Sequence, residues 1–138
     1  TENTMFRKGN ILLVDDSMAQ LGRLQNHLAV HADKIFLAQS GLEALSMIQN
    51  EKIHCIVCGY EMAGMNGLEV LQELRSHDVK TPFIFYSANS SKSFLVEAAR
   101  QGAYALLLKP DKPSLERIVK EALKEGFSKR KRYLTYSK

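Results

Sequence analysis

The chain has 138 residues, the size of one ordinary globular domain. Hydrophobic residues make up 45% of it and charged residues 25%, a composition that excludes an intrinsically disordered chain. No apolar run approaches the roughly 20 residues of a membrane span, and the polar start lacks the apolar core of a signal peptide, so we expect a cytoplasmic protein with no membrane partner.

The net charge of +4 comes from the end of the chain. Residues 124–138 contain six basic residues and one acidic residue, so the remainder is close to neutral. A short basic segment is most often a solvated helix end or a linker, and we therefore do not expect nucleic acid as a partner. We divide the chain into an N-terminal extension at 1–9, a single domain at 10–126 and a basic tail or linker at 127–138.

In chain order, short apolar runs alternate with stretches of helical period. The runs have the length of strands and contain few polar residues, as expected when helices cover both faces of a parallel sheet. This alternation predicts an α/β fold with a doubly wound, five-stranded parallel sheet and five helices. The predicted strands are Ile11–Val14, Ile35–Ala38, Cys55–Cys58, Phe83–Tyr86 and Ala105–Leu108.

Between the strands, apolar residues recur at the three- and four-residue spacing of a buried helix face. We interpret these stripes as core and not as cofactor-binding surfaces. The five stripes are Leu21, Leu24 and Leu28; Leu42, Leu45 and Ile48; Leu68, Leu71 and Leu74; Leu95, Ala98 and Ala99; and Leu115, Ile118, Val119, Ala122 and Leu123.

Cap and turn residues indicate where the helices begin. Ser40 is expected to cap the second helix, and Asn66-Gly67 to open the third. The fifth helix is expected to begin after Pro113, with Ser114 as its cap.

Two cysteines, Cys55 and Cys58, have C-x-x-C spacing. Residues three apart on a strand point to opposite faces, and no second pair of ligands accompanies these two. We therefore interpret them as buried, unpaired thiols rather than as a redox or metal site. The four histidines are interpreted as surface or helix-end residues rather than metal ligands, although His27 and His31 are four residues apart; they are His27, His31, His54 and His77.

Polar side chains follow four of the five predicted strands. Asp15 and Asp16 follow the first, Glu61 lies just beyond the third, Ser87 follows the fourth and Lys109 follows the fifth. In an open parallel sheet these positions meet at one edge, where ligands bind. Carboxylates hold a hydrated Mg²⁺, and a hydroxyl and an ammonium stabilise phosphoryl oxygens. The sequence therefore predicts a cation and phosphoryl site at this edge.

Four motifs occur in order along the chain: Ile11-Leu12-Leu13-Val14-Asp15-Asp16-Ser17, Met62-Ala63-Gly64-Met65-Asn66-Gly67, Ser87-Ala88 and Lys109-Pro110. Together they resemble the response-regulator receiver domain of two-component signalling, over about residues 10–125. The resemblance implies the CheY-like, flavodoxin-like strand order 2-1-3-4-5 and a cis bond between Lys109 and Pro110. It also implies an Asp at the end of the third strand that accepts a phosphoryl group from a histidine kinase.

The resemblance gives each residue of the edge a role. Asp16 corresponds to the direct Mg²⁺ ligand and Asp15 to the ligand that acts through water. Ser87 corresponds to the hydroxyl that contacts the phosphoryl group, and Lys109 to the ammonium that pairs with it. We expect Mg²⁺ binding to be weak or absent, Lys109 to pair with Asp16, and Glu61 to reach a weakly held cation.

Two departures from the family pattern decide the predicted function. The acceptor Asp of the family stands three residues before the Met of the following loop, and here Gly59 stands three residues before Met62. Glycine has neither a nucleophile nor a metal ligand. The second departure is Leu106, where the family carries the aromatic residue whose rotation reports phosphorylation. Tyr104, two residues earlier, is expected on the same side of the strand.

We therefore predict a receiver-like domain that acts as a protein-interaction module without phosphorylation. Its expected partners are signalling proteins such as a histidine kinase or an output domain, or a second copy bound through the fourth and fifth helices. Two alternatives stay open: a phosphorylatable receiver with an introduced Asp-to-Gly change at Gly59, and the receiver part of a DNA-binding regulator. An enzyme of flavodoxin-like shape is disfavoured, because no Gly-rich phosphate loop follows the first strand.

Overall fold

The computed structural model describes the backbone of residues 7–136 and the side chains of residues 7–126. Within this range the chain forms a sheet of five parallel strands in the order β2-β1-β3-β4-β5. The predicted fold class and strand order are therefore confirmed. The strands are β1 (Asn10–Val14), β2 (Lys34–Ala38), β3 (Cys55–Cys58), β4 (Phe83–Ser87) and β5 (Ala105–Leu108).

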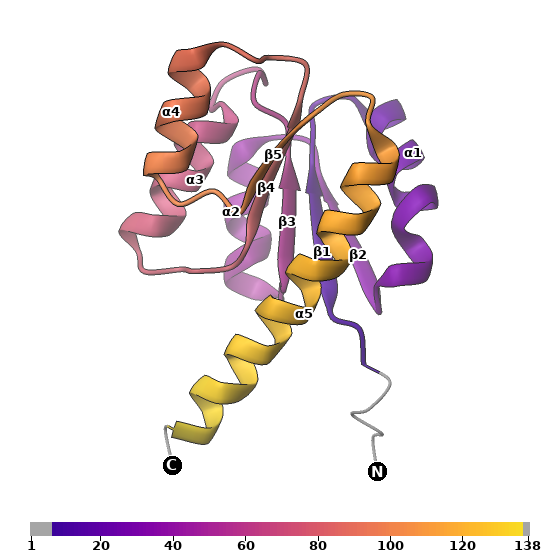
Figure 1. The fold of residues 1–138 in the computed structure, drawn as a ribbon, viewed down its shortest axis with the longest axis vertical. Coiled ribbons are helices and arrows are strands. Elements are labelled where there is room, and N and C mark those ends of the chain that lie inside the picture. The colour runs from indigo at the N-terminus through magenta and orange to yellow at the C-terminus, as the bar shows by residue number, and fades with distance from the viewer. Residues whose placement is uncertain (1–6, 137–138) are drawn as a thin grey trace.

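Helices cover both faces of the sheet. Figure 1 shows α1 and α5 on one side and α2, α3 and α4 on the other. The helices are α1 (Met18–Leu28), the short 3₁₀ helix η2 (Ala29–His31), α2 (Gly41–Asn50), α3 (Gly67–Ser76), α4 (Lys92–Arg100) and α5 (Lys112–Tyr136).

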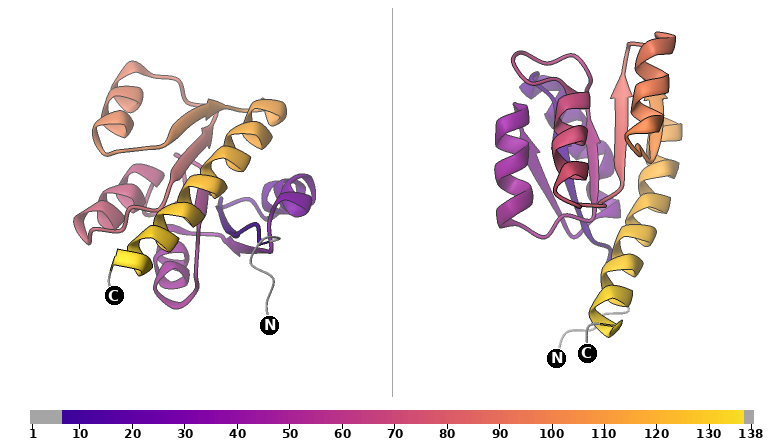
Figure 2. Two further views of the ribbon diagram at one scale, coloured as in Figure 1. Left: turned by 60° about the horizontal axis from the view of Figure 1, so that its bottom comes forward. Right: turned by 90° about the vertical axis from the view of Figure 1, so that its left-hand side faces the viewer.

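The last helix is the longest, and its final turns extend past the edge of the sheet in each view of Figures 1 and 2. It runs through most of the segment predicted as a tail, while the role of that segment as a linker stays a prediction. Residues 1–6 of the predicted N-terminal extension and residues 137–138 lie outside the described residues. No helix within residues 7–136 is both long enough and apolar enough to cross a membrane.

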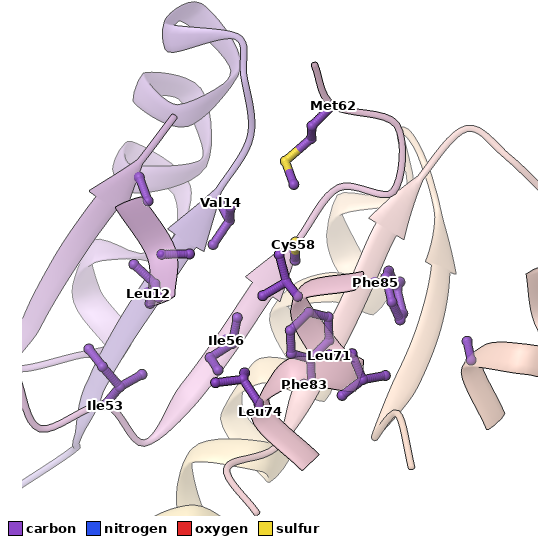
Figure 3. Packing of buried hydrophobic residues seen from close by; sticks show 14 of the residues in the cluster. Leu12, Val14, Ile53, Ile56, Cys58, Met62, Leu71, Leu74, Phe83 and Phe85 are labelled. Atoms are coloured by element: carbon purple, nitrogen blue, oxygen red, sulfur yellow. The ribbon is translucent and has the colours of Figure 1, made fainter. Parts of the chain in front are cut away.

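Each face of the sheet has its own hydrophobic core. Alternate residues of β3 divide between them: Ile56 and Cys58 pack toward α2, α3 and α4, whereas Cys55 and Val57 pack toward α1 and α5. Figure 3 shows the first of these cores, with Phe83 and Phe85 of β4 beside Ile56 and Cys58. The two thiols are buried and unpaired on opposite faces, as predicted. Burial raises the pKa of both thiols well above the ordinary value.

Most of the predicted helix stripes lie in these cores, but three residues do not. Leu42 of α2 is 70% exposed, Leu95 of α4 is 38% exposed and Ala99 of α4 is exposed, so the predicted helical phase was wrong for these residues. In α4 the buried residues are Phe94 and Ala98, which are four apart and therefore share a helix face. Leu95 lies one position round the helix and faces outward.

Side-chain caps begin α2 and α3 where the sequence predicted. The Ser40 hydroxyl accepts a hydrogen bond from the backbone N–H of Glu43 at 3.1 Å. At the start of α3, Asn66 and Glu69 cap each other's backbone N–H groups at 2.9 and 2.8 Å. This reciprocal pair is a capping box, and it fixes the start of the helix.

The predicted start of α5 was wrong. The helix begins at Lys112, and Asp111 caps it by accepting a hydrogen bond from the backbone N–H of Ser114 at 3.1 Å. Hydrogen bonds from Ser114 lower the pKa of the Asp111 carboxyl. Proline is tolerated in the first helical turn because the N–H groups there have no partner within the helix, so Pro113 does not delay the start.

The two histidines at the end of α1 and in η2 contact α5. His31 Nε2 lies 2.5 Å from one carboxylate oxygen of Glu116, and His27 Nε2 lies 3.6 Å from the other. Both histidines are at helix ends, as predicted. The same prediction was wrong for His54, which is buried just before β3. The hydrogen bond from His31 is the main reason why the pKa of Glu116 is lowered.

Candidate functional site

The carboxyl ends of β1, β3, β4 and β5 lie at one edge of the sheet, because the strands are parallel and adjacent. Asp15 directly follows β1, Gly59 follows β3, Ser87 ends β4 and Lys109 follows β5. We call these four residues, together with Asp16, the rim. The fold therefore brings the positions predicted from the sequence to the same edge.

An ion pair joins the two outer strands of the rim. Lys109 Nζ lies 3.2 Å from Asp15 Oδ2, and the Asp15 side chain is only 10% exposed. The other carboxylate oxygen of Asp15 accepts a hydrogen bond from the backbone N–H of Ser17 at 2.9 Å. Asp15 is thus held by one ammonium and one backbone amide.

The prediction that Lys109 pairs with Asp16 was wrong. Asp16 is exposed, and its carboxylate accepts a hydrogen bond from the backbone N–H of Ala63 at 3.3 Å. Ala63 belongs to the loop between β3 and α3, so Asp16 faces that loop whereas Asp15 faces Lys109. Neighbouring carboxylates after one strand therefore have different partners.

Lys109 is positioned by its own backbone and by β4. The bond between Lys109 and Pro110 is cis, as predicted. The Lys109 N–H donates to the carbonyl oxygen of Ser87 at 3.0 Å, and Nζ lies 6.0 Å from the centre of the Tyr86 ring. Ser87 is buried, and its hydroxyl accepts a hydrogen bond from the Asn89 N–H at 3.0 Å. The hydroxyl and the ammonium are therefore held on adjacent strands.

Gly59 occupies the centre of the rim without requiring the special freedom of glycine. Its N–H donates to the carbonyl oxygen of Val14 at 3.0 Å, and its φ lies outside the left-handed region. A Cβ placed on Gly59 would lie 3.4 Å from Asp15 Oδ2 and 3.9 Å from the Val14 oxygen, which are ordinary contacts. The backbone at this position therefore accommodates a Cβ.

A hollow of about 460 Å³ lies beside Asp16. It is lined by Asp16, Tyr60, Glu61, Met62, Gly64 and Asn66. Within the described side chains, no three His, Cys, Asp or Glu residues converge closely enough to hold a metal ion. The residues present therefore do not form a ready-made Mg²⁺ site, since Asp15 is paired with Lys109 and Gly59 supplies no carboxylate.

Comparison with known families agrees with this arrangement. The family model for the response regulator receiver domain matches residues 11–121. The chain belongs to this family. Receiver domains are signalling modules of two-component systems, so membership of the family gives this chain a signalling role.

The receiver domain has relatives among bacterial regulators. It is 34% identical over 115 residues to the transcriptional regulatory protein ZraR of Klebsiella oxytoca, an alignment that covers 83% of the chain and 26% of ZraR. It is 29% identical over 121 residues to the transcriptional regulatory protein GlrR of Escherichia coli, covering 87% of the chain and 27% of GlrR. The chain thus spans about a quarter of the length of these relatives.

Solved structures share the fold. A CheY-like response regulator receiver domain protein from Methanospirillum hungatei superposes with a TM-score of 0.81 at 25% sequence identity. The superposition covers 88% of this chain and 98% of the other. Nearly the whole of that protein therefore has its counterpart in this receiver domain.

The structure separates Leu106, the predicted switch residue, from Tyr104. Leu106 packs against the core under α2, α3 and α4, whereas Tyr104 packs against the core under α1 and α5. The prediction that they share a side was wrong, because Tyr104 precedes β5 and the alternation of a strand does not extend to it. Burial is the main reason why the pKa of the Tyr104 hydroxyl is raised.

Sequence reasoning missed an aromatic contact beside the rim. The ring of Tyr60, the residue after Gly59, stacks on the ring of Phe94 in α4 with centres 4.2 Å apart. The α4 stripe had been placed on Leu95, one residue away. A signal was present, because Phe94 and Ala98 also have core spacing and phenylalanine is the larger apolar residue.

Proposed function

We propose that this receiver domain signals by docking to a partner protein without phosphorylation of an aspartate. The observation that carries the proposal is Gly59 at the end of β3, three residues before Met62, where the family has its acceptor. Glycine cannot form an acyl phosphate. The ordinary backbone at Gly59 supports a simple loss of the carboxylate, because a Cβ at this position meets only ordinary contacts.

The rest of the rim corresponds to the phosphoryl site of the family. In this proposal Ser87 and Lys109 are remnants of the groups that contact the phosphoryl oxygens, and Asp15 and Asp16 are remnants of the Mg²⁺ site. Receiver domains typically bind Mg²⁺ at that site. Here we expect at most weak binding, with Glu61 as an additional ligand, because Mg²⁺ gives up its water only to well-formed sets of oxygen ligands. A titration that gives a dissociation constant far below millimolar would contradict this.

The docking face in this proposal is formed by α4, β5 and α5. Leu95 and Val96 of α4 are 38% and 49% exposed, and Leu108 of β5 is 50% exposed. Exposed aliphatic side chains on adjacent elements support a protein-binding face. The expected partner is a signalling protein such as a histidine kinase or an output domain, or a second copy of this domain.

Incubation with Mg²⁺ and a small-molecule phosphodonor such as acetyl phosphate, followed by measurement of the intact mass, tests the proposal. We expect no added phosphoryl group on this chain. An added phosphoryl group that hydroxylamine removes would contradict the proposal, because it would reveal an acyl phosphate at another carboxylate.

A second candidate function is the receiver part of a longer, DNA-binding transcriptional regulator. It is favoured by the relatives, which are transcriptional regulatory proteins about four times as long as the match. The continuation of α5 to Tyr136 suits a connection to a following domain. Sequencing the native gene tests this reading, and it also shows whether Gly59 is native or introduced.

A further inference from the structure

The ring of Tyr60 connects the loop after β3 to α4. The two rings of Tyr60 and Phe94 are stacked, with an angle of 20° between their planes. Phe94 is only 3% exposed, and its ring meets that of Phe85 in β4 edge to face at 5.0 Å. A fixed ring in the core of the domain therefore supports the partly exposed ring of Tyr60.

The backbone beneath these rings is equally constrained. The Gly67 N–H at the start of α3 donates to the carbonyl oxygen of Tyr60 at 2.8 Å. A Cβ placed on Gly67 would lie 2.8 Å from the Phe85 ring, so glycine lets α3 begin directly against that ring. Four residues are thus linked by contacts, each to the next and the last to the first: Tyr60 in the loop, Gly67 in α3, Phe85 in β4 and Phe94 in α4.

We propose that the stack of Tyr60 on Phe94 couples the loop at the rim to α4, so that displacement of either one displaces the other. Tyr60 is also one of the residues that line the hollow beside Asp16, so a group bound in that hollow lies next to this residue. On β5 the corresponding switch position holds the aliphatic Leu106, which offers no ring for this purpose. The coupling is independent of whether α4 docks to a partner.

Coupling between two places is reciprocal, and that property provides the test. Amide hydrogen exchange is measured on the whole chain for the parent, Tyr60→Leu and Phe94→Leu. We expect Tyr60→Leu to accelerate exchange in Lys92–Arg100 roughly two- to tenfold, the effect of losing one aromatic pair. We expect Phe94→Leu to accelerate exchange of the Gly67 amide and its neighbours in the loop.

Two control variants separate coupling from general loss of stability. Tyr60→Phe keeps the ring and is expected to leave exchange in α4 unchanged. Phe83→Leu removes another ring of the same core, one that lies 5.0 Å from Phe85, and is expected to leave the ratio of exchange in α4 to exchange in α1 near its parent value. If Tyr60→Leu leaves α4 as slow as in the parent, or accelerates α1 as much as α4, the coupling does not exist.

Discussion

Two parts of the rim are built from different chemistry. At the outer strands, β1 and β5, a largely buried carboxylate of Asp15 pairs with the ammonium of Lys109 at 3.2 Å. In the central part, after β3, Gly59 has no side chain and the next residue, Tyr60, stacks its ring on Phe94 of α4. The outer part is held by charge and hydrogen bonds, and the central part by packing of rings against the core.

The difference explains how the domain tolerates a glycine at the centre of the rim. Asp15 keeps its partners because Ser17 and Lys109 hold it from elements other than β3. The loop after β3 keeps its position because Tyr60 is anchored through its ring and its carbonyl oxygen. Neither part of the rim depends on a carboxylate at position 59, so the fold persists without it.

The largest effect is expected for Gly67→Ala, which disturbs the central part of the rim, where the loop after β3 packs against the core. The new Cβ would lie 2.2 Å from the carbonyl oxygen of Gly59, and a backbone atom cannot move aside cheaply. We expect the free energy of unfolding to fall by about 2–3 kcal/mol in urea denaturation. The control is Gly22→Ala in α1, where nothing lies within 4 Å of the new Cβ. That change is expected to stabilise the domain by up to about 1 kcal/mol, and equal effects of both changes would contradict the account.

Gly59→Asp adds a negative charge to the central part of the rim, beside the ion pair of Asp15 and Lys109. At a separation of about 5 Å and an effective dielectric constant near 20, its repulsion with Asp15 is roughly 3 kcal/mol, which attraction to Lys109 and the reduced freedom of the unfolded chain partly offset. We expect the variant without Mg²⁺ to be about 1–2 kcal/mol less stable than the matched variant Gly59→Asn. Mg²⁺ is expected to raise the Tm of Gly59→Asp much more than that of Gly59→Asn. Equal shifts in thermal melts would place Gly59 away from the metal site.

Lys109→Met removes the charge that neutralises Asp15. Leaving a buried carboxylate unpaired costs several kcal/mol, but Lys109 is about a third exposed and solvent screens the loss, so we expect about 1 kcal/mol in the free energy of unfolding. Lys80→Met is the matched control, since Lys80 and Asp78 form a pair at 3.0 Å that is mostly exposed. We expect almost no change there, and a cost as large as that of Lys109→Met would show that burial of Asp15 is unimportant.

The smallest effect is expected at Glu116, on α5, which serves as a reference for a half-exposed contact. The hydrogen bond from His31 lowers its pKa below the ordinary value of 4.5. A carboxyl with a lowered pKa contributes stability above its unfolded pKa and loses it as the pH falls through its folded pKa. We expect Glu116→Gln to lower the Tm slightly at neutral pH and to converge with the parent as the pH falls through the lowered pKa of Glu116. A difference that persists unchanged in acid would show that charge at Glu116 is irrelevant.

The features that were predicted correctly from the sequence are those that local residue patterns determine. The strand bounds followed to within one residue from nearly unbroken apolar runs, and the cap at Ser40 followed from residue type and position. The sequence could not predict that Lys109 pairs with Asp15 and not with Asp16. Both carboxylates follow the same strand, and only the fold shows which of them faces β5. The stack of Tyr60 on Phe94 also depends on how α4 is rotated about its axis relative to the sheet. An error of one residue in the predicted helical phase, Leu95 in place of Phe94, was enough to miss it.

Phosphorylation of Gly59→Asp beside Gly59→Asn tests the central claim most directly, namely that Gly59 stands at the acceptor position of an otherwise retained site. The two variants have side chains of the same shape and differ in the nucleophile. After incubation with Mg²⁺ and a phosphodonor, the intact mass of Gly59→Asp is expected to show one added phosphoryl group that hydroxylamine removes, while Gly59→Asn shows none. Failure of Gly59→Asp to gain the group, or its equal gain by Gly59→Asn, would contradict the claim.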